Sequence, residues 1–165
     1  MTDVVPDPVD ELAVCRTLYR FAAAIDTRDW VGYRSVFTDE IELDYSSYRP
    51  GNVGRVRADD WVARAQAMFP GLDASQHCLY NPLVTVEGDS ADIAIYVQAE
   101  HFLTNDQGDN WFTLGGYYKD RLVRVDGDWR ICSKALVVLW NRGNRQVLRL
   151  AADRVRERAA PPTAR

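Results

Sequence analysis

The spacing of hydrophobic positions changes along the chain, from a helical period near the N-terminus to a strand-like alternation in the later part. Asp7-Pro8 is a favourable start for a helix, because aspartate caps the first backbone N–H groups and proline fits the first helical position. The residues that follow carry one apolar stripe at helical spacing, formed by Val14, Leu18, Phe21 and Ile25. This stripe predicts an amphipathic helix that ends close to Asp26.

Two shorter helices are expected after the first one. Asp29 is placed to cap a short helix, and a third helix is predicted from about residue 59 to residue 69, where Pro70-Gly71 stops it. Between these helices, residues 41–45 alternate apolar and polar side chains, which predicts a strand with one buried face. The residues that follow this strand, 48–57, contain proline and two glycines and are expected to form a loop.

The later segments alternate apolar and polar residues and are bounded by turn-forming residues, so each predicts a strand. Asp126-Gly127 is a strong hairpin signal, and Gly115-Gly116 inside one strand indicates a β-bulge or a sharp bend. Long strands joined by short turns form an antiparallel meander. The four strands are expected at residues 76–86, 91–103, 111–125 and 129–140.

Helices followed by long strands are typical of an α+β roll. N-terminal helices packed on a strongly curved, mostly antiparallel sheet cover only one of its faces. A cone-shaped pocket then remains between the two layers, and such pockets bind small molecules. We expect residues 1–152 to form this single domain and residues 153–165 to form a flexible tail.

Composition narrows the function classes. The 165 residues carry a net charge of -4, and Lys and Arg are scattered, which argues against a nucleic-acid partner. The three cysteines lie far apart in the sequence, so neither a disulfide framework nor a zinc cage is expected. The first ten residues lack the pattern of a secretory signal, and the longest apolar run, residues 135–140, is too short to span a bilayer. We therefore expect a cytoplasmic protein with no membrane partner.

Several polar groups fall on faces that the pattern predicts to be apolar. His101 shares its strand face with six apolar residues, and His77 shares its face with Leu79. These are the only two histidines, and adjacent antiparallel strands can bring them into one cavity. Asp26 ends the apolar helix stripe and would point at the same cavity, and Tyr45 faces inward on its strand.

This set favours acid–base chemistry. An Asp beside a His orients the imidazole and stabilises the imidazolium that forms when the ring accepts a proton. Tyr45 would polarise a carbonyl, directly or through water. Structural roles remain open: the histidines as satisfied core residues, Asp26 as a helix cap, and Tyr45 as a core aromatic residue.

Two other chemistries have weaker support. His77, His101 and Asp26 could form a facial triad for iron, but the close His-x-Asp/Glu spacing is absent, since Leu79 stands two residues past His77. Cys78 is expected on the opposite face of the strand from His77, and the chain has no Gly-x-Ser-x-Gly elbow for a nucleophile. We therefore expect no metal site.

The chain resembles the nuclear transport factor 2-like superfamily, in its SnoaL-like and scytalone dehydratase branch. The similarity covers residues 10–144 and lies in four stretches: AIDTRDWVGYRSVFTDEIELDYSSY, SQHCLY, QAEHFL and GGYYKDRLVRVDGDWRI. It implies a cone-shaped α+β barrel of the cystatin-like type. By resemblance to scytalone dehydratase, Asp26, Tyr45, His77 and His101 occupy catalytic positions, and neither a metal nor an organic cofactor is used.

The resemblance implies a cofactor-independent lyase that removes a proton alpha to a carbonyl and expels water. His77 is expected to be the base, oriented by Asp26, with His101 as an acid or second base. The substrate would be hydrophobic, carbonyl-bearing and cyclic, or similar to a polyketide or steroid. The residues expected to contact it are Tyr33, Phe69, Val97, Tyr118 and Trp140.

The sequence departs from scytalone dehydratase in the carbonyl-binding half of the site. Ile25 stands where that enzyme has a tyrosine, and its late-strand Ser and Asn have no clear match near Gly116 and Tyr118. Alternatives therefore stay open, because fold alone does not choose a function. They are a polyketide cyclase, a ketosteroid-type isomerase, and a non-catalytic beta subunit or binding module of a larger oxygenase. A homo-oligomer, either a dimer or a trimer, is also expected, through an outer sheet face that carries Tyr96, Gln98 and Phe102.

Overall fold

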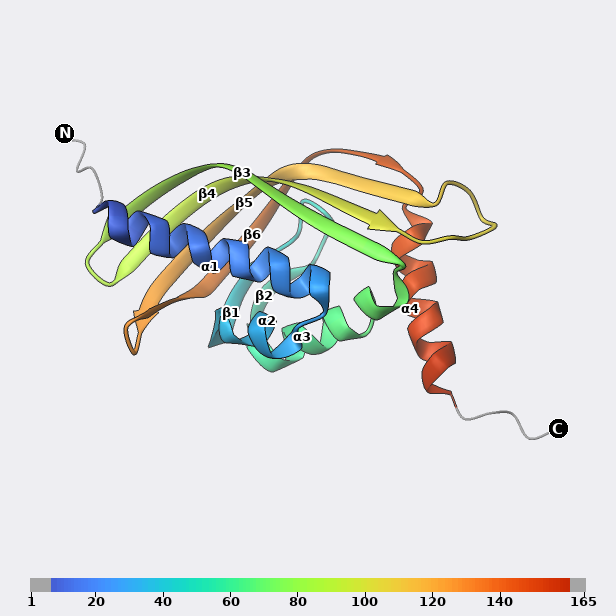
Figure 1. Ribbon diagram of the computed structural model, residues 1–165, viewed down its shortest axis with the longest axis horizontal. Coiled ribbons are helices and arrows are strands. Elements are labelled where there is room, and N and C mark those ends of the chain that lie inside the picture. Colours follow the sequence, from blue (N-terminus) through green and yellow to red (C-terminus); the bar gives the residue numbers. More distant parts are fainter. Residues whose placement is uncertain (1–6, 161–165) are drawn as a thin grey trace.

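The computed structural model describes residues 7–160, which fold into one curved sheet with helices on its concave side and at one end (Figure 1). The helices are α1 (Pro8–Thr27), α2 (Trp30–Ser35), α3 (Ala58–Gln66), the 3-10 turn η1 (Phe69–Gly71) and α4 (Gln146–Ala159). The strands are β1 (Phe37–Asp44), β2 (Val53–Arg57), β3 (Ala74–Glu87), β4 (Ser90–Phe102), β5 (Trp111–Val125) and β6 (Asp128–Gly143).

The six strands follow the order β2-β1-β6-β5-β4-β3. Only the β1–β6 pair is parallel, and the other four pairs are antiparallel. In Figure 1 the long strands β3 to β6 arch over α1, which runs below them along the concave side. The predicted α+β class, with N-terminal helices on a curved and mostly antiparallel sheet, is confirmed.

The first helix forms as the sequence predicts. The Asp7 carboxylate accepts a hydrogen bond from the Val9 N–H (2.9 Å), and Pro8 occupies the first turn. All four stripe residues are at most 4% exposed, and burying such side chains contributes roughly 1.5–3 kcal/mol each. The helix ends at Thr27, and its C-terminal cap, Arg28, adopts left-handed backbone geometry (φ 62°). Asp29 then caps α2 by accepting a hydrogen bond from the Gly32 N–H. This short turn fixes where Asp26 lies relative to the sheet.

The strands also match their predicted positions, with one additional strand, and the last helix extends further than expected. The β-bulge indicated by Gly115-Gly116 is present, as a register shift between β5 and β6 at these residues. Residues 53–57, expected to lie in a loop, instead form β2, which pairs antiparallel with β1, and the hydrogen bond from Tyr45 N–H to the Asn52 carbonyl closes the loop between them. The tail predicted from residue 153 does not begin there, because α4 continues to Ala159. Residues 161–165 lie outside the described part of the chain.

Aromatic residues are exposed on the outer face of the sheet. Tyr80, Tyr96 and Tyr117 lie opposite one another on β3, β4 and β5, and Tyr80 and Tyr96 are both almost half exposed. The homo-oligomer expected through this face stays a prediction. Between residues 7 and 160, no helix combines the length and the apolar character that a membrane-spanning helix needs.

A buried ion pair lies beneath α1. The Lys134 ammonium contacts the Asp120 carboxylate at 2.6 Å, and neither side chain is exposed. The same ammonium lies 3.5 Å from the centre of the Tyr118 ring and 4.0 Å from that of Phe21, which adds cation–π attraction. Burial raises the pKa of Asp120 and lowers the pKa of Lys134, and the mutual attraction of the two groups opposes both shifts.

We expect Lys134→Met to lower the free energy of unfolding by roughly 3–5 kcal/mol, because it leaves the Asp120 carboxylate buried without its partner. The double variant Asp120→Leu/Lys134→Met should recover most of this loss, because two apolar side chains need no desolvated charge. Urea denaturation of the single and double variants measures both effects. A double variant as unstable as the sum of the two singles would show that the pair is not coupled.

Candidate active site

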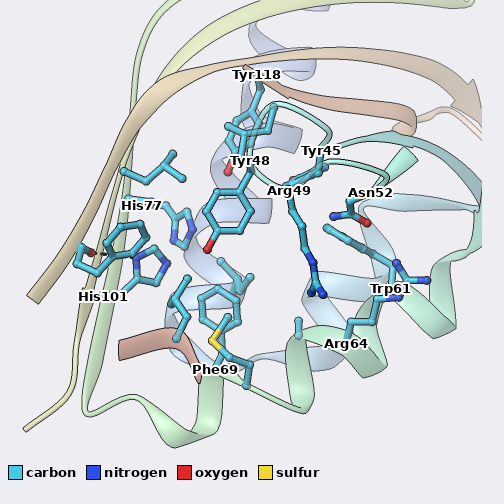
Figure 2. Close-up of a pocket in the computed structure, with 18 of the residues that line it drawn as sticks. Tyr45, Tyr48, Arg49, Asn52, Trp61, Arg64, Phe69, His77, His101 and Tyr118 are labelled. Carbon is cyan, nitrogen blue, oxygen red and sulfur yellow. Dashed lines mark hydrogen bonds between the residues drawn. The ribbon is translucent and has the colours of Figure 1, made fainter. Parts of the chain in front are cut away.

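A cavity of about 740 Å³ lies between the concave face of the sheet, α1, α3 and the loop formed by residues 45–52 (Figure 2). Most of its wall is apolar or aromatic, which is typical of a small-molecule site. The apolar and aromatic lining residues are Phe21, Ile25, Tyr33, Tyr45, Tyr48, Trp61, Ala65, Met68, Phe69, Ala99, Phe112, Leu114, Tyr118, Leu136 and Leu148. The two histidines also line this cavity.

Asp26 and His77 are joined by two hydrogen bonds, and His77, but not Asp26, lines the cavity. Asp26 occupies the last turn of α1, and His77 lies near the start of β3, against which α1 packs. The His77 Nδ1 lies 2.8 Å from Asp26 Oδ1, and the His77 backbone N–H donates to Asp26 Oδ2 at 2.6 Å. Because both carboxylate oxygens are engaged, the ring and the carboxylate hold each other in one orientation.

Ser75 and Arg28 support this pair from behind. The Ser75 hydroxyl donates to Asp26 Oδ1 (3.0 Å), and Arg28 donates to Ser75 Oγ (2.8 Å) and to the Asp26 backbone carbonyl (2.6 Å). Neither residue was predicted. The strand period gives a signal for Ser75, since it stands two residues before His77 on the same face. For Arg28, the left-handed backbone that directs its side chain is a tertiary feature.

The protonation of this pair follows from its surroundings. Burial would raise the pKa of Asp26, but the side-chain hydrogen bond and charge of His77, with bonds from the His77 backbone and Ser75, lower the pKa overall. Asp26 is therefore ionised at neutral pH, and its carboxylate accepts a hydrogen bond from the Nδ1–H of His77. The hydrogen bond therefore places a proton on His77 Nδ1 and leaves Nε2 on the ring edge opposite Asp26.

His101 lies beside His77 and is neutral. The two ring centres are 5.8 Å apart, because β3 and β4 place Ser75 opposite His101 and His77 opposite Ala99. The His101 Nδ1 lies 3.2 Å from the Phe112 carbonyl oxygen, which only accepts, so Nδ1 carries the proton. Burial, followed by the charge of His77, lowers the pKa of His101 from 6.5 to about 4. At neutral pH the His101 ring therefore presents an unprotonated Nε2.

The predicted tyrosines and Phe69 also line the cavity. Tyr33, Tyr45 and Tyr118 contribute to its wall, and burial raises the pKa of all three, so their hydroxyls remain protonated and act as hydrogen-bond donors. The Phe69 ring centre lies 5.9 Å from that of His77 and 6.0 Å from that of His101. The cavity lining thus contains three of the four predicted catalytic residues and three of the five predicted contact residues. Asp26, which was expected to point at the cavity, is not part of the lining and contacts it through His77.

The two remaining contact residues, Trp140 and Val97, do not line the cavity. Trp140 was expected to contact the substrate. The bulge opposite Gly115-Gly116 inserts one residue into β6, so the alternation reverses and Trp140 covers Gly115 instead, with 43% of its surface exposed. Val97 is buried further along β4, in the closed part of the core.

The mouth of the cavity contains residues that the sequence did not single out. Tyr48, Arg49 and Asn52 belong to the loop of residues 45–52, and Trp61 and Arg64 belong to α3. In Figure 2 the Tyr48 hydroxyl points to the side of the cavity where the two histidines lie. The helical spacing of Trp61, Ala65 and Met68 carried a signal for an inward face. The loop carried none, since its residues have no periodicity.

A metal site is not supported by this donor set. Among residues 7–160, no three His, Cys, Asp or Glu side chains are grouped to hold an ion. Asp26 lies at the Nδ1 edge of His77, whereas the free Nε2 is on the opposite edge of the ring. Asp26 and the two Nε2 atoms therefore do not converge as the facial triad requires.

Known protein families and solved structures resemble this chain in fold. Residues 9–135 match the model of the SnoaL-like domain. None of the curated proteins matches the chain significantly. Among solved structures, the Kfla4162 protein of Kribbella flavida is 25% identical, with a TM-score of 0.78 over 90% of this chain and 97% of that one.

Two further neighbours carry the names of enzymes and show the fold that they share with this chain. A protein of Novosphingobium aromaticivorans, provisionally named a scytalone dehydratase, is 19% identical, with a TM-score of 0.74 over 83% of this chain and 89% of that one. Hexachlorocyclohexane dehydrochlorinase LinA-type3 of Novosphingobium barchaimii is 17% identical, with a TM-score of 0.64 over 83% and 92%. The neighbours also include a Mycobacterium tuberculosis protein of unknown function.

The low pKa of His101 predicts how stability depends on pH. Between pH 6.5 and about pH 4 the unfolded chain binds a proton at this residue that the folded chain does not, so stability falls as the pH falls through this window. The free energy of unfolding that is lost across this window through His101 amounts to about 3 kcal/mol. Urea denaturation between about pH 7.5 and about pH 4.5 should therefore show a steeper loss for the natural protein than for His101→Phe. Parallel curves for the two proteins would contradict the buried, neutral state of His101.

Proposed function

Since the chain belongs to the SnoaL-like family, we propose that it is a cofactor-independent lyase. Its reaction would remove a proton alpha to a carbonyl and expel water from a hydrophobic, cyclic substrate. The observation that carries this proposal is the His77–Asp26 pair, in which Nδ1 bonds to Asp26 and the opposite, Nε2 edge of the ring belongs to a residue that lines an apolar cavity. The names of two structural neighbours, a dehydratase and a dehydrochlorinase, both denote the elimination of a small molecule, which supports the proposed reaction type.

His77 is the proposed base. Its Nε2 takes the proton from the carbon next to the carbonyl, and the imidazolium that forms is stabilised by the Asp26 carboxylate 2.8 Å from Nδ1. The neighbouring His101 lacks a carboxylate partner and has a pKa of about 4, so it is the weaker base. The two histidines therefore have different roles, set by the group at each Nδ1.

The tyrosine hydroxyls are the proposed partners of the carbonyl. As the proton leaves, negative charge develops on the carbonyl oxygen, and donors already in place stabilise it. Tyr45 and Tyr118 line the same cavity as His77 and remain protonated, because burial raises the pKa of each. Tyr45 keeps the role that was expected for it, and Tyr118 adds a second donor.

Loss of water completes the reaction. The electron pair of the broken C–H bond becomes the new C=C bond, the C–O bond at the next carbon breaks, and the proton on His77 Nε2 passes to the departing hydroxide. One group thus acts first as base and then as acid, with no other reactant. Because His101 is unprotonated at Nε2, its proposed role is to accept a hydrogen bond from the departing hydroxyl and orient it, rather than to act as an acid.

Proton abstraction can be tested with model ketones. In D₂O, 1-tetralone should exchange its alpha protons, and 3-hydroxy-1-tetralone should lose water to give 1-naphthol, both followed by NMR. We expect His77→Asn and Asp26→Asn to lower both rates by roughly 10²–10⁴-fold while circular dichroism stays unchanged. Tyr96→Phe, on the outer face of the sheet, is the matched control and should retain both rates.

The alternatives give different results in the same assay. Exchange of the alpha protons without formation of 1-naphthol would favour an isomerase or cyclase, which needs only the first half of the reaction. Equal rates in the natural protein and in both folded variants would remove His77 and Asp26 from the chemistry. Absence of exchange with every ketone tested would favour the non-catalytic binding module.

A further inference from the structure

The mouth of the cavity differs in charge from its inner end. Arg49 and Arg64 are the cationic residues of the lining, and none of the lining residues among residues 7–160 is an aspartate or glutamate. Within that range neither guanidinium has an ion pair or a hydrogen bond from its side chain. The proposed lyase reaction uses neither residue.

Both arginines are held on ordered elements. The loop that carries Arg49 is closed by backbone hydrogen bonds from Tyr45 N–H to the Asn52 carbonyl (2.8 Å) and from Arg49 N–H to the Tyr45 carbonyl (2.9 Å). Arg64 lies near the end of α3, one turn after Trp61. The Tyr45 and Trp61 rings pack at 5.1 Å, so the loop and α3 are fastened to each other beside the mouth. In Figure 2 Arg49 extends from the loop toward the helix that carries Arg64.

Two like charges at one opening repel each other unless an anion lies between them. A guanidinium binds a carboxylate through paired N–H donors, and Asn52, which also lines the mouth, adds an amide donor. The wall between the mouth and the histidines is apolar and aromatic. A ligand that fits this arrangement has a ring system between two polar ends: a carbonyl near the tyrosines and histidines, and an anionic group at the mouth.

We propose that Arg49 and Arg64 bind a carboxylate on the substrate, so that the natural substrate is a cyclic keto acid. This inference rests on the proposed function for the carbonyl end, whereas the anion site depends only on the mouth. The two arginines then determine substrate specificity and the direction in which the ring system enters the cavity. They take no part in proton transfer.

Ligand binding tests the anion site without turnover. The probes are 2-naphthoate and the neutral 2-acetylnaphthalene, which share a ring system, and calorimetry measures the affinity of each. The natural protein should bind the acid more tightly than the ketone, and added NaCl should weaken only the acid. Arg49→Gln and Arg64→Gln should each weaken naphthoate binding by ~10-fold and leave the ketone within about two-fold, since a charge-assisted hydrogen bond is lost in each.

Arg20→Gln is the matched control, because Arg20 is exposed on α1 and does not line the cavity. It should not change the affinity for either probe. Equal affinity of the natural protein for the two probes, or an equal loss for both probes in the arginine variants, would overturn the proposal. Preference for naphthoate in a protein that exchanges no ketone protons would keep the anion site and reject the lyase. Ketone exchange without that preference would do the reverse.

Discussion

The packing of α1 across the concave side of the sheet is the constraint on which the rest of the structure depends. Its apolar stripe is buried almost completely, and the sheet must curve to cover it. That curvature leaves a cavity between the concave face of the sheet, α1, α3 and the loop of residues 45–52. The same packing lays the last turn of the helix against β3, where Asp26 reaches His77. Fold, cavity and His–Asp pair therefore share one cause.

The two histidines differ chemically because different groups lie at their Nδ1 atoms. A carboxylate lies 2.8 Å from Nδ1 of His77, whereas Nδ1 of His101 faces a backbone carbonyl at 3.2 Å, and burial lowers the pKa of His101. Backbone groups help to position both rings. The Phe112 carbonyl, which lies on β5, contacts His101, and the His77 N–H helps to hold Asp26. Under the proposed function, this preorganisation would need no movement of the two histidines when substrate binds.

Charge in this protein is arranged by depth. The Asp120–Lys134 pair is sealed beneath α1, the Asp26–His77 pair borders the cavity, and Arg49 and Arg64 stand at its exposed mouth. Of these six side chains, only those of Arg49 and Arg64 have no hydrogen-bond or ion-pair partner among residues 7–160. They are also the groups that a ligand entering the cavity would reach first. A long cyclic ligand would therefore be oriented by charge at the mouth and by hydrogen bonds at the inner end.

The sequence by itself determined the elements and the faces on which their side chains lie. The helical stripe, the alternation of β4 and the hairpin at Asp126-Gly127 are local patterns, and burial of apolar side chains decides them. Whereas Asp26 contacts the cavity wall only through His77, the inward positions of Tyr45, His77 and His101 followed from these same patterns. Trp140 did not, because a one-residue bulge reverses every face beyond it.

Only the tertiary structure decided which side chains meet. The pairing register set the distance between the two histidines, and the left-handed turn at Arg28 set the support behind Asp26. The arginines at the mouth lie on a loop and on an exposed helix face, where no periodic pattern marks them. Local patterns reflect burial, which each residue carries in its own chemistry, whereas contacts between distant segments depend on how the whole sheet curves around α1.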